Sequence, residues 1–134
     1  MNSARGLVPP GLLMEVEAAD AAARAARAVP GVVRLQPGVW GLLRQFAVRA
    51  WEQTTGKVLP DIAGVDARLV EDGTRLRVEL RIVVSIHSQA AAVGAAVHEA
   101  VTVAAIEAAG KPVEVTVHIV EIDLEPQQAR PLDG

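Results

Sequence analysis

Three histidines, His87, His98 and His118, are the side chains of this 134-residue chain that are best suited to chemistry. Histidine can exchange a proton near neutral pH or ligate a transition metal through a ring nitrogen. No two of them are four residues apart, as they would be on one face of a metal-binding helix, and no HExxH motif occurs. We therefore expect no metal site. An enzyme would need two of them within ligand distance of each other.

Acidic and hydroxyl side chains give no stronger sign of catalysis. Glu121, Asp123 and Glu125 alternate along one predicted strand, so they share a face and could hold a cation weakly. Such a run is more typical of a solvated strand end that discourages edge-to-edge pairing. No GxSxG nucleophile motif and no phosphate-binding loop of the Walker or Rossmann type occurs. We predict no catalytic residue and no cofactor, and hence a protein that is not an enzyme.

A short glycine motif leaves one alternative open. The stretch Gly38-Val39-Trp40-Gly41 matches the GxxG of the KH nucleic-acid-binding module. Its middle residues are apolar and it follows a predicted strand, whereas the KH motif joins two helices. The net charge of −3 also disfavours nucleic acid, which needs an excess of lysine and arginine. A KH-like module remains the alternative function, and it would require a continuous basic groove beside this motif.

Two groups of side chains are candidates for binding a partner. Trp40, Phe46 and Trp51 are the only aromatic residues, and the period of segment 39–51 is helical. This segment either covers the sheet with its apolar face or binds a partner. The second group lies on the solvent-facing side of a predicted strand, where it forms ordinary charge pairs or binds an acidic partner. It consists of Arg75, Arg77 and Arg81.

Composition restricts the class of protein. The chain is 51% hydrophobic and 22% charged, which is typical of a globular domain. It has no cysteine, which excludes disulfides, zinc–thiolate sites and cysteine nucleophiles and suits a reducing compartment. No run of roughly 18 apolar residues occurs, so we expect no membrane span. Residues 1–10 lack a charged head followed by an apolar stretch, so we expect no signal peptide.

Periodicity predicts the elements that must position these residues. Helices are expected over 13–29, 39–51 and 88–109, and strands over 31–36, 62–70, 75–86 and 112–124. Glu71-Asp72-Gly73-Thr74 is a strong hairpin signal between two strands. Strand 75–86 alternates apolar and charged residues, which indicates a sheet that is buried on one side only. The helix between the last two strands favours a parallel crossover.

The sequence thus predicts an α+β fold, with a small mixed sheet of three or four strands and two main helices on one face. Its order is α-β-(α)-β-β-α-β. We expect one domain over 13–125, with a lead-in over 1–12 and a disordered tail over 126–134. Ser88 is expected to cap the long helix, whose core stripe has three valines and three alanines. The stripe comprises Val93, Val97, Ala100, Val101, Ala104 and Ala108.

The last strand contains a change of phase. Val113, Val115, Val117 and Ile119 hold one phase of the alternation, whereas Val120, Ile122 and Leu124 hold the other. A period of two that slips by one residue predicts a bulge or a change of neighbour.

Three stretches of the chain resemble the alkaline shock protein family, the envelope-stress proteins of Gram-positive bacteria. They cover most of residues 15–124 and are patterns of core residues, so their specificity is low. The turn at residues 85–88 lacks the tyrosine-glycine usual in that family, and segment 39–51 is longer and more aromatic. The stretches are the Ala-rich helix running into Val29-Pro30-Gly31-Val32 with Leu35, the strand Leu76 to Val84 followed by a helix with Val93, Val97 and Val101, and Gly110-Lys111-Pro112 followed by the valine alternation to Ile119.

The resemblance implies a non-enzymatic cytoplasmic protein that associates with itself as a homo-oligomer. It further implies recruitment to the inner face of the cell membrane by a small membrane-anchoring protein, and a function in envelope homeostasis or alkaline stress. The family has no catalytic residues to carry over to this sequence. The Ala- and Arg-rich composition suggests a high-GC organism, such as an actinobacterium.

Overall fold

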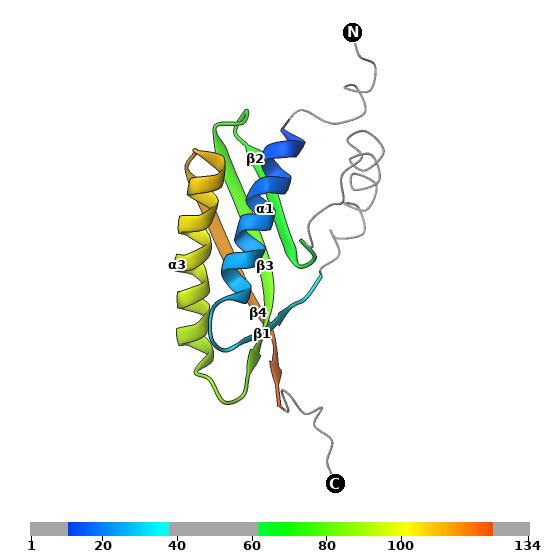
Figure 1. Cartoon of the computed structure of the whole chain (residues 1–134), viewed down its shortest axis with the longest axis vertical. Helices are drawn as coiled ribbons and strands as arrows, with labels where there is room; N and C mark the ends of the chain where they lie inside the picture. Colours follow the sequence, from blue (N-terminus) through cyan, green and yellow to red (C-terminus); the bar gives the residue numbers. More distant parts are fainter. Residues whose placement is uncertain (1–10, 38–61, 125–134) are drawn as a thin grey trace.

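The structure, a computed structural model, describes residues 11–37 and 62–124 (Figure 1). Two helices and four strands follow one another in these two ranges. The predicted helix over 39–51, with Trp40, Phe46 and Trp51, and the predicted tail over 126–134 lie outside them. The elements are α1 (Leu12–Arg27), β1 (Val32–Leu35), β2 (Val65–Val70), β3 (Arg75–Ser85), α3 (Ala90–Ala109) and β4 (Val113–Asp123).

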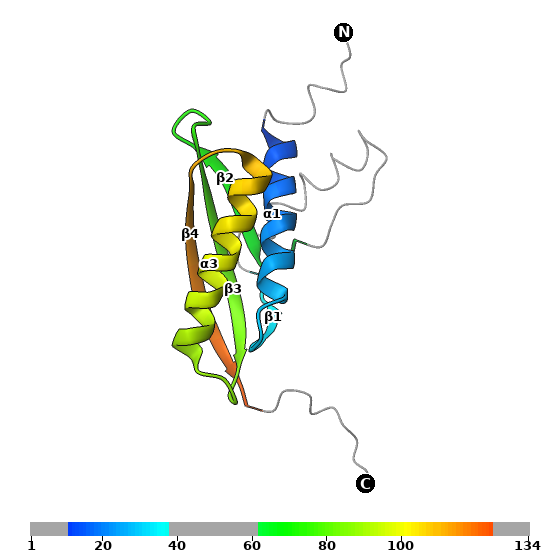
Figure 2. The same cartoon turned by 60° about the vertical axis from the view of Figure 1, so that its left-hand side comes forward.

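The predicted α+β fold with a small mixed sheet is confirmed. Strand β3 lies at the centre, with β1 and β2 antiparallel to it on one side and β4 parallel to it on the other. Helix α3 provides the crossover between the two parallel strands. Both helices pack on one face of the sheet and against each other (Figure 2).

Strands β1 and β2 together occupy one edge of the sheet. Strand β1 pairs with Ile82–Val84 of β3, and β2 pairs with the preceding residues of β3. They meet at Arg81, whose N–H donates to the carbonyl of Gly64 and whose carbonyl accepts from the N–H of Gln36. The chain therefore leaves this edge at Gln36 and returns to it at Gly64, next to the point of departure.

The core lies between the sheet and the two helices. One side of β3 supplies large aliphatic side chains that are fully buried, as its alternation predicts. Helix α1 meets them with alanines, which are also fully buried. Small side chains let a helix approach its neighbours closely, and the aliphatic residues of the sheet then fill the space. These residues are Leu76, Val78, Leu80, Ile82 and Val84 of β3, and Ala18, Ala19, Ala22, Ala23 and Ala26 of α1.

The core stripe of α3 differs from the expected one in its second half. Val93, Val97 and Val101 are buried as predicted, but the stripe continues every fourth residue through Ala105 and Ala109. Ala100 and Ala104 are half-buried, and Ala108, which was expected in the core, is exposed. A strict spacing of four drifts around a straight helix, and the buried face follows that drift because α3 crosses the sheet obliquely.

The turns confirm one sequence signal and correct another. Glu71, Asp72 and Gly73 all have positive φ in the hairpin, as the Asp-Gly signal indicates. Ser88 was expected to cap α3, and this is wrong. The cap residue is Gln89, which makes no side-chain cap hydrogen bond. The N–H of Ser88 donates instead to the carbonyl of Ser85 in a preceding turn, which places the helix start further along the chain.

The predicted phase change in the last strand is a bulge. Ile119 pairs with Ile82 and Glu121 pairs with Val83, so Val120 is the additional residue of β4. Beyond it, Ile122 joins the helix-facing side of the sheet, opposite Val84. Glu121 consequently lies on the solvent-facing side.

Candidate functional site

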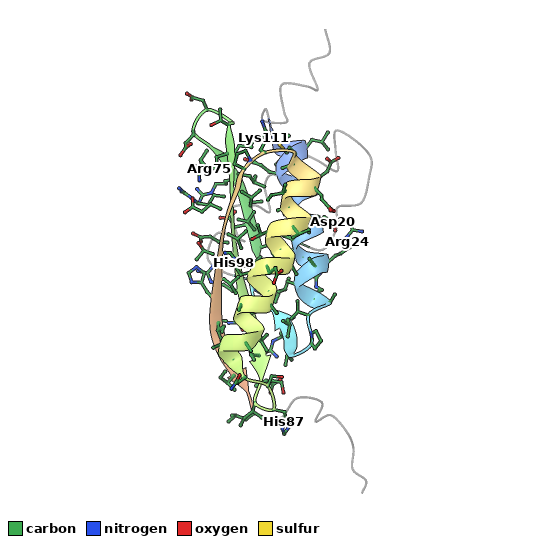
Figure 3. All side chains as sticks on the ribbon, turned by 90° about the vertical axis from the view of Figure 1, so that its left-hand side faces the viewer. Asp20, Arg24, Arg75, His87, His98 and Lys111 are labelled. Atoms are coloured by element: carbon green, nitrogen blue, oxygen red, sulfur yellow. The ribbon has the colours of Figure 1, made fainter. Side chains whose placement is uncertain are left out.

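The three histidines do not form a site. His87 lies in the turn between β3 and α3, His98 lies on α3 and His118 on β4, and all three are exposed. Figure 3 shows His87 near one end of the molecule and His98 well away from it along α3. Within residues 11–37 and 62–124, no group of three or more histidine, cysteine or acidic side chains could hold a metal ion.

A shallow hollow of about 320 Å³ lies beside β1. The described residues that line it belong to the end of α1, to β1 and to the start of the segment before β2. Two of them are arginines and the others are apolar, so these residues supply no acid–base pair and no nucleophile. They are Arg27, Val32, Val33, Arg34, Leu35 and Ala63.

Two of the three candidate arginines have acidic partners on the solvent-facing side of the sheet. The Nε of Arg77 lies 3.5 Å from Oε1 of Glu114 on β4. The Nε of Arg75 lies 3.5 Å from Oε1 of Glu71 in the hairpin. Arg81 lies further along β3, just before the residues that pair with β1, and it is half-buried. Ordinary charge pairing thus accounts for Arg75 and Arg77, and this face offers no continuous basic groove among the described residues.

An ion pair that joins the two outer strands covers a buried valine. Arg34 on β1, Val83 on β3 and Glu121 on β4 are cross-strand neighbours on the solvent-facing side. Arg34 reaches over Val83, with its Nη2 3.4 Å from Oε1 of Glu121 and its Nη1 3.7 Å from Oδ2 of Asp123. Val83 is fully buried beside it. Two of the three acidic residues expected at a solvated strand end therefore bind an arginine, and Glu125 lies outside the described residues.

Replacing Arg34 with alanine should lower the free energy of unfolding by about 1 kcal/mol, because it removes both an exposed ion pair and the alkyl cover of Val83. Arg24→Ala is the matched control, since Arg24 also pairs with an acid, Asp20, but on the surface of α1. Urea unfolding at low and high salt measures both variants. A cost for Arg34→Ala no larger than that of the control would show that the bridge does not protect Val83.

Sequence reasoning only partly identified two groups of exposed apolar side chains, one on α3 and one at the end of β4. Val103 and Ile106 of α3 are 53% and 44% exposed. The second half of β4 exposes three further aliphatic side chains, and the residue after the strand exposes a fourth. The sequence signals were the two aliphatic residues off the core stripe of α3 and the phase change of the last strand. The exposed residues of this part of the chain are Ile119, Val120, Ile122 and Leu124.

The two edges of the sheet, at β2 and at β4, differ in how their backbone groups are covered. On the side of β2, the Glu15 carboxylate of α1 accepts a hydrogen bond of 2.8 Å from the backbone N–H of Leu69. That contact satisfies a donor that points away from β3. Strand β4 has the sheet on one side only, and the described residues place no strand on its other side.

Helix α3 is also, among the described residues, the one helix that is long and apolar enough to cross a membrane. Its 20 residues include a window of 18 with a mean hydropathy of 1.4. Its valine stripe packs on the sheet, and 22% of that window is buried.

The aromatic candidates Trp40, Phe46 and Trp51, and the Gly38–Gly41 motif, lie outside the described residues. No family model, no curated protein and no solved structure matches the chain.

Proposed function

We propose that this chain is a non-enzymatic cytoplasmic scaffold of the envelope-stress response and cell-envelope homeostasis. It associates with itself and is held at the inner face of the cell membrane by a small membrane-anchoring protein. The observation that supports this most is the set of exposed apolar side chains on α3 and at the end of β4, which includes Val103, Ile106 and Ile122. Soluble proteins that expose such a surface commonly use it to bind another protein.

The arrangement of polar groups supports a scaffold over an enzyme or a nucleic-acid binder. The histidines lie apart, and the hollow beside β1 has no described acid–base pair. Arg77 and Arg34 bind acidic side chains of β4, which lowers the positive potential that a phosphate backbone would require. Residue types and geometry therefore favour protein–protein contact.

The proposal predicts a location and a phenotype in the native host. A fluorescent fusion should concentrate at the cell membrane, and a deletion strain should grow more slowly after a shift to alkaline pH. Replacing Val103 with glutamate should abolish most of the membrane enrichment, because a charge among the exposed apolar side chains of α3 opposes partner binding. Glu107→Gln is the control, since it alters an exposed residue one turn further along α3 without adding an acid.

Fluorescence microscopy and growth curves measure these effects, with immunoblots to compare the amounts of protein. A uniformly distributed fusion together with normal alkaline growth would contradict the proposal. Co-purification of RNA with the chain, lost at high salt, would instead favour the KH-like alternative.

A further inference from the structure

The backbone of β4 presents a regular row of hydrogen-bonding groups that no strand of the described residues pairs with. The carbonyl of Pro112 accepts from the N–H of Leu76, so residue 112 faces β3. Successive residues of a strand direct their backbone groups to opposite sides. Every second residue from 113 to the bulge therefore directs its N–H and C=O away from β3. These residues are Val113, Val115, Val117 and Ile119.

The first seven residues of this edge lack most of the features that usually protect an exposed strand, whereas its end carries a bulge and the acidic side chains of Glu121 and Asp123. Strand β4 spans Val113–Asp123 and contains neither proline nor lysine. Its bulge at Val120 lies toward its end, which leaves a straight stretch of seven residues from 113 to 119. Long edges that lack such protection template pairing with another strand. On the side of β2, by contrast, Glu15 occupies a backbone donor.

We infer that a second copy of this chain pairs antiparallel with β4, with a two-fold axis at Thr116, so that two sheets become one. This register places Thr116 opposite Thr116 of the other copy and Glu114 opposite His118 of the other copy, twice by symmetry. Carboxylate–imidazole and threonine–threonine pairs are both favourable across strands. On the helix-facing side of the sheet, Val115 then lies opposite Val117 of the other copy, and Val113 lies opposite Ile119 of the other copy.

The polar side chains of β4 favour this register over its neighbours. Moving the axis by one residue, to Val115 or Val117, removes both pairs between Glu114 and His118. Moving it by two residues places either two glutamates or two imidazoles directly opposite each other, which is unfavourable for the carboxylates. Only the axis at Thr116 pairs apolar with apolar and acid with imidazole along the whole straight stretch.

Helix α3 of each copy would lie on the same face of the joined sheet, close to the axis. Gly94 of α3 faces Ile119, because a Cβ at Gly94 would lie 3.2 Å from the Cδ1 of that isoleucine. Helix α3 thus lies above β4, and the two-fold axis brings α3 of the second copy alongside it. Ala95 and Ile106 follow Gly94 around the helix and are both exposed. They are the residues of α3 that the second copy would cover.

The contact gives the proposed self-association its geometry, and it is tested on the purified full chain, separately from the envelope function in cells. The chain has no cysteine, so single cysteines report on one position each. Thr116→Cys should form a disulfide-linked dimer under mild oxidation, because opposed Cβ atoms of such a pair are about 5 Å apart. Glu114→Cys is the matched control on the same face of β4, with its two copies roughly 13 Å apart.

The expected yield of covalent dimer is at least about tenfold higher for Thr116→Cys than for Glu114→Cys, because only the first pair meets disulfide geometry. Mixing Glu114→Cys with His118→Cys should form a mixed dimer. Equal cross-linking of the two single variants, or none with Thr116→Cys, overturns the register and the proposal.

Light scattering on the unmodified chain provides a second measurement. It should give about twice the 14.0 kDa monomer mass. Val117→Pro should give a monomer with unchanged circular dichroism, since the N–H that it removes points away from β3. An unmodified chain that stays monomeric at about 100 μM, where a micromolar contact would be saturated, overturns the proposal.

Discussion

Replacing Leu80 with alanine should lower the free energy of unfolding by about 3–4 kcal/mol. Leu80 is fully buried at the middle of the central strand, where it faces both helices. The cost includes the lost transfer of the isobutyl group from water and the cavity that remains. The neighbours of Leu80 cannot easily close that cavity, because α1 contributes alanines, which have no side-chain rotamers with which to fill space.

Leu13→Ala is the control for this substitution. Leu13 is 52% exposed on α1, so the same change of residue should cost less than about 1 kcal/mol there. Chemical unfolding followed by circular dichroism gives both values. Similar losses for the two variants would mean that the interface between the sheet and the helices is not the core of this protein.

Replacing Gly31 with alanine should destabilise the fold by about 2–4 kcal/mol, for two combined reasons. Gly31 has a φ of 99°, a region that residues with a side chain rarely adopt. An added Cβ would also lie 2.6 Å from Cγ2 of Val93 and 2.8 Å from Oγ of Ser88. Both groups belong to the start of α3 or the turn before it, so the clash would push α3 away from the turn that follows α1.

Gly110→Ala separates these two contributions. Gly110 also has a positive φ, of 67°, but a Cβ there would have no neighbour within 4 Å. It should therefore show only the backbone cost, about 1 kcal/mol. Thermal unfolding of the two variants measures the difference, and equal losses would show that Gly31 is required for its backbone conformation alone.

The central strand and its hairpin could be predicted from the sequence because their signals are local. The alternation of Leu76 to Val84 fixes which side of β3 is buried, and Asp72-Gly73 fixes the turn. The phase change of the last strand was predictable too, with a bulge or a change of neighbour as its two explanations, and the pairing with β3 shows a bulge at Val120. In each case, neighbours in the sequence carry the whole pattern.

Contacts between distant segments could not be predicted in the same way. Arg34 and Glu121 are 87 residues apart, and only the order of the strands brings them to the two sides of Val83. The meeting of β1 and β2 at Arg81 likewise depends on pairing with a third strand. No local sequence pattern indicates that β1 and β2, two short strands, lie end to end along the same edge of β3.

The start of α3 shows how a local rule can fail. Serine before a helix is a common cap, and Ser88 fits that rule. In the structure, Ser85 stabilises a turn here instead. Its Oγ accepts a hydrogen bond from the N–H of His87, and its carbonyl accepts one from the N–H of Ser88. The side chain of Ser88 faces Gly31, so contact with the turn after α1 outweighs capping at this position.

The hydrogen bond from Leu69 to Glu15 limits how far sheets of this protein can grow. If each subunit joins another only through β4, it has a single edge strand that is open to pairing. In a dimer, the β4 edges of both subunits are occupied. Such a system stops at a pair and does not polymerise into a fibre. Glu15 thus makes β2 a poorer template for a further strand than β4, and a larger array of these subunits would need a second contact surface.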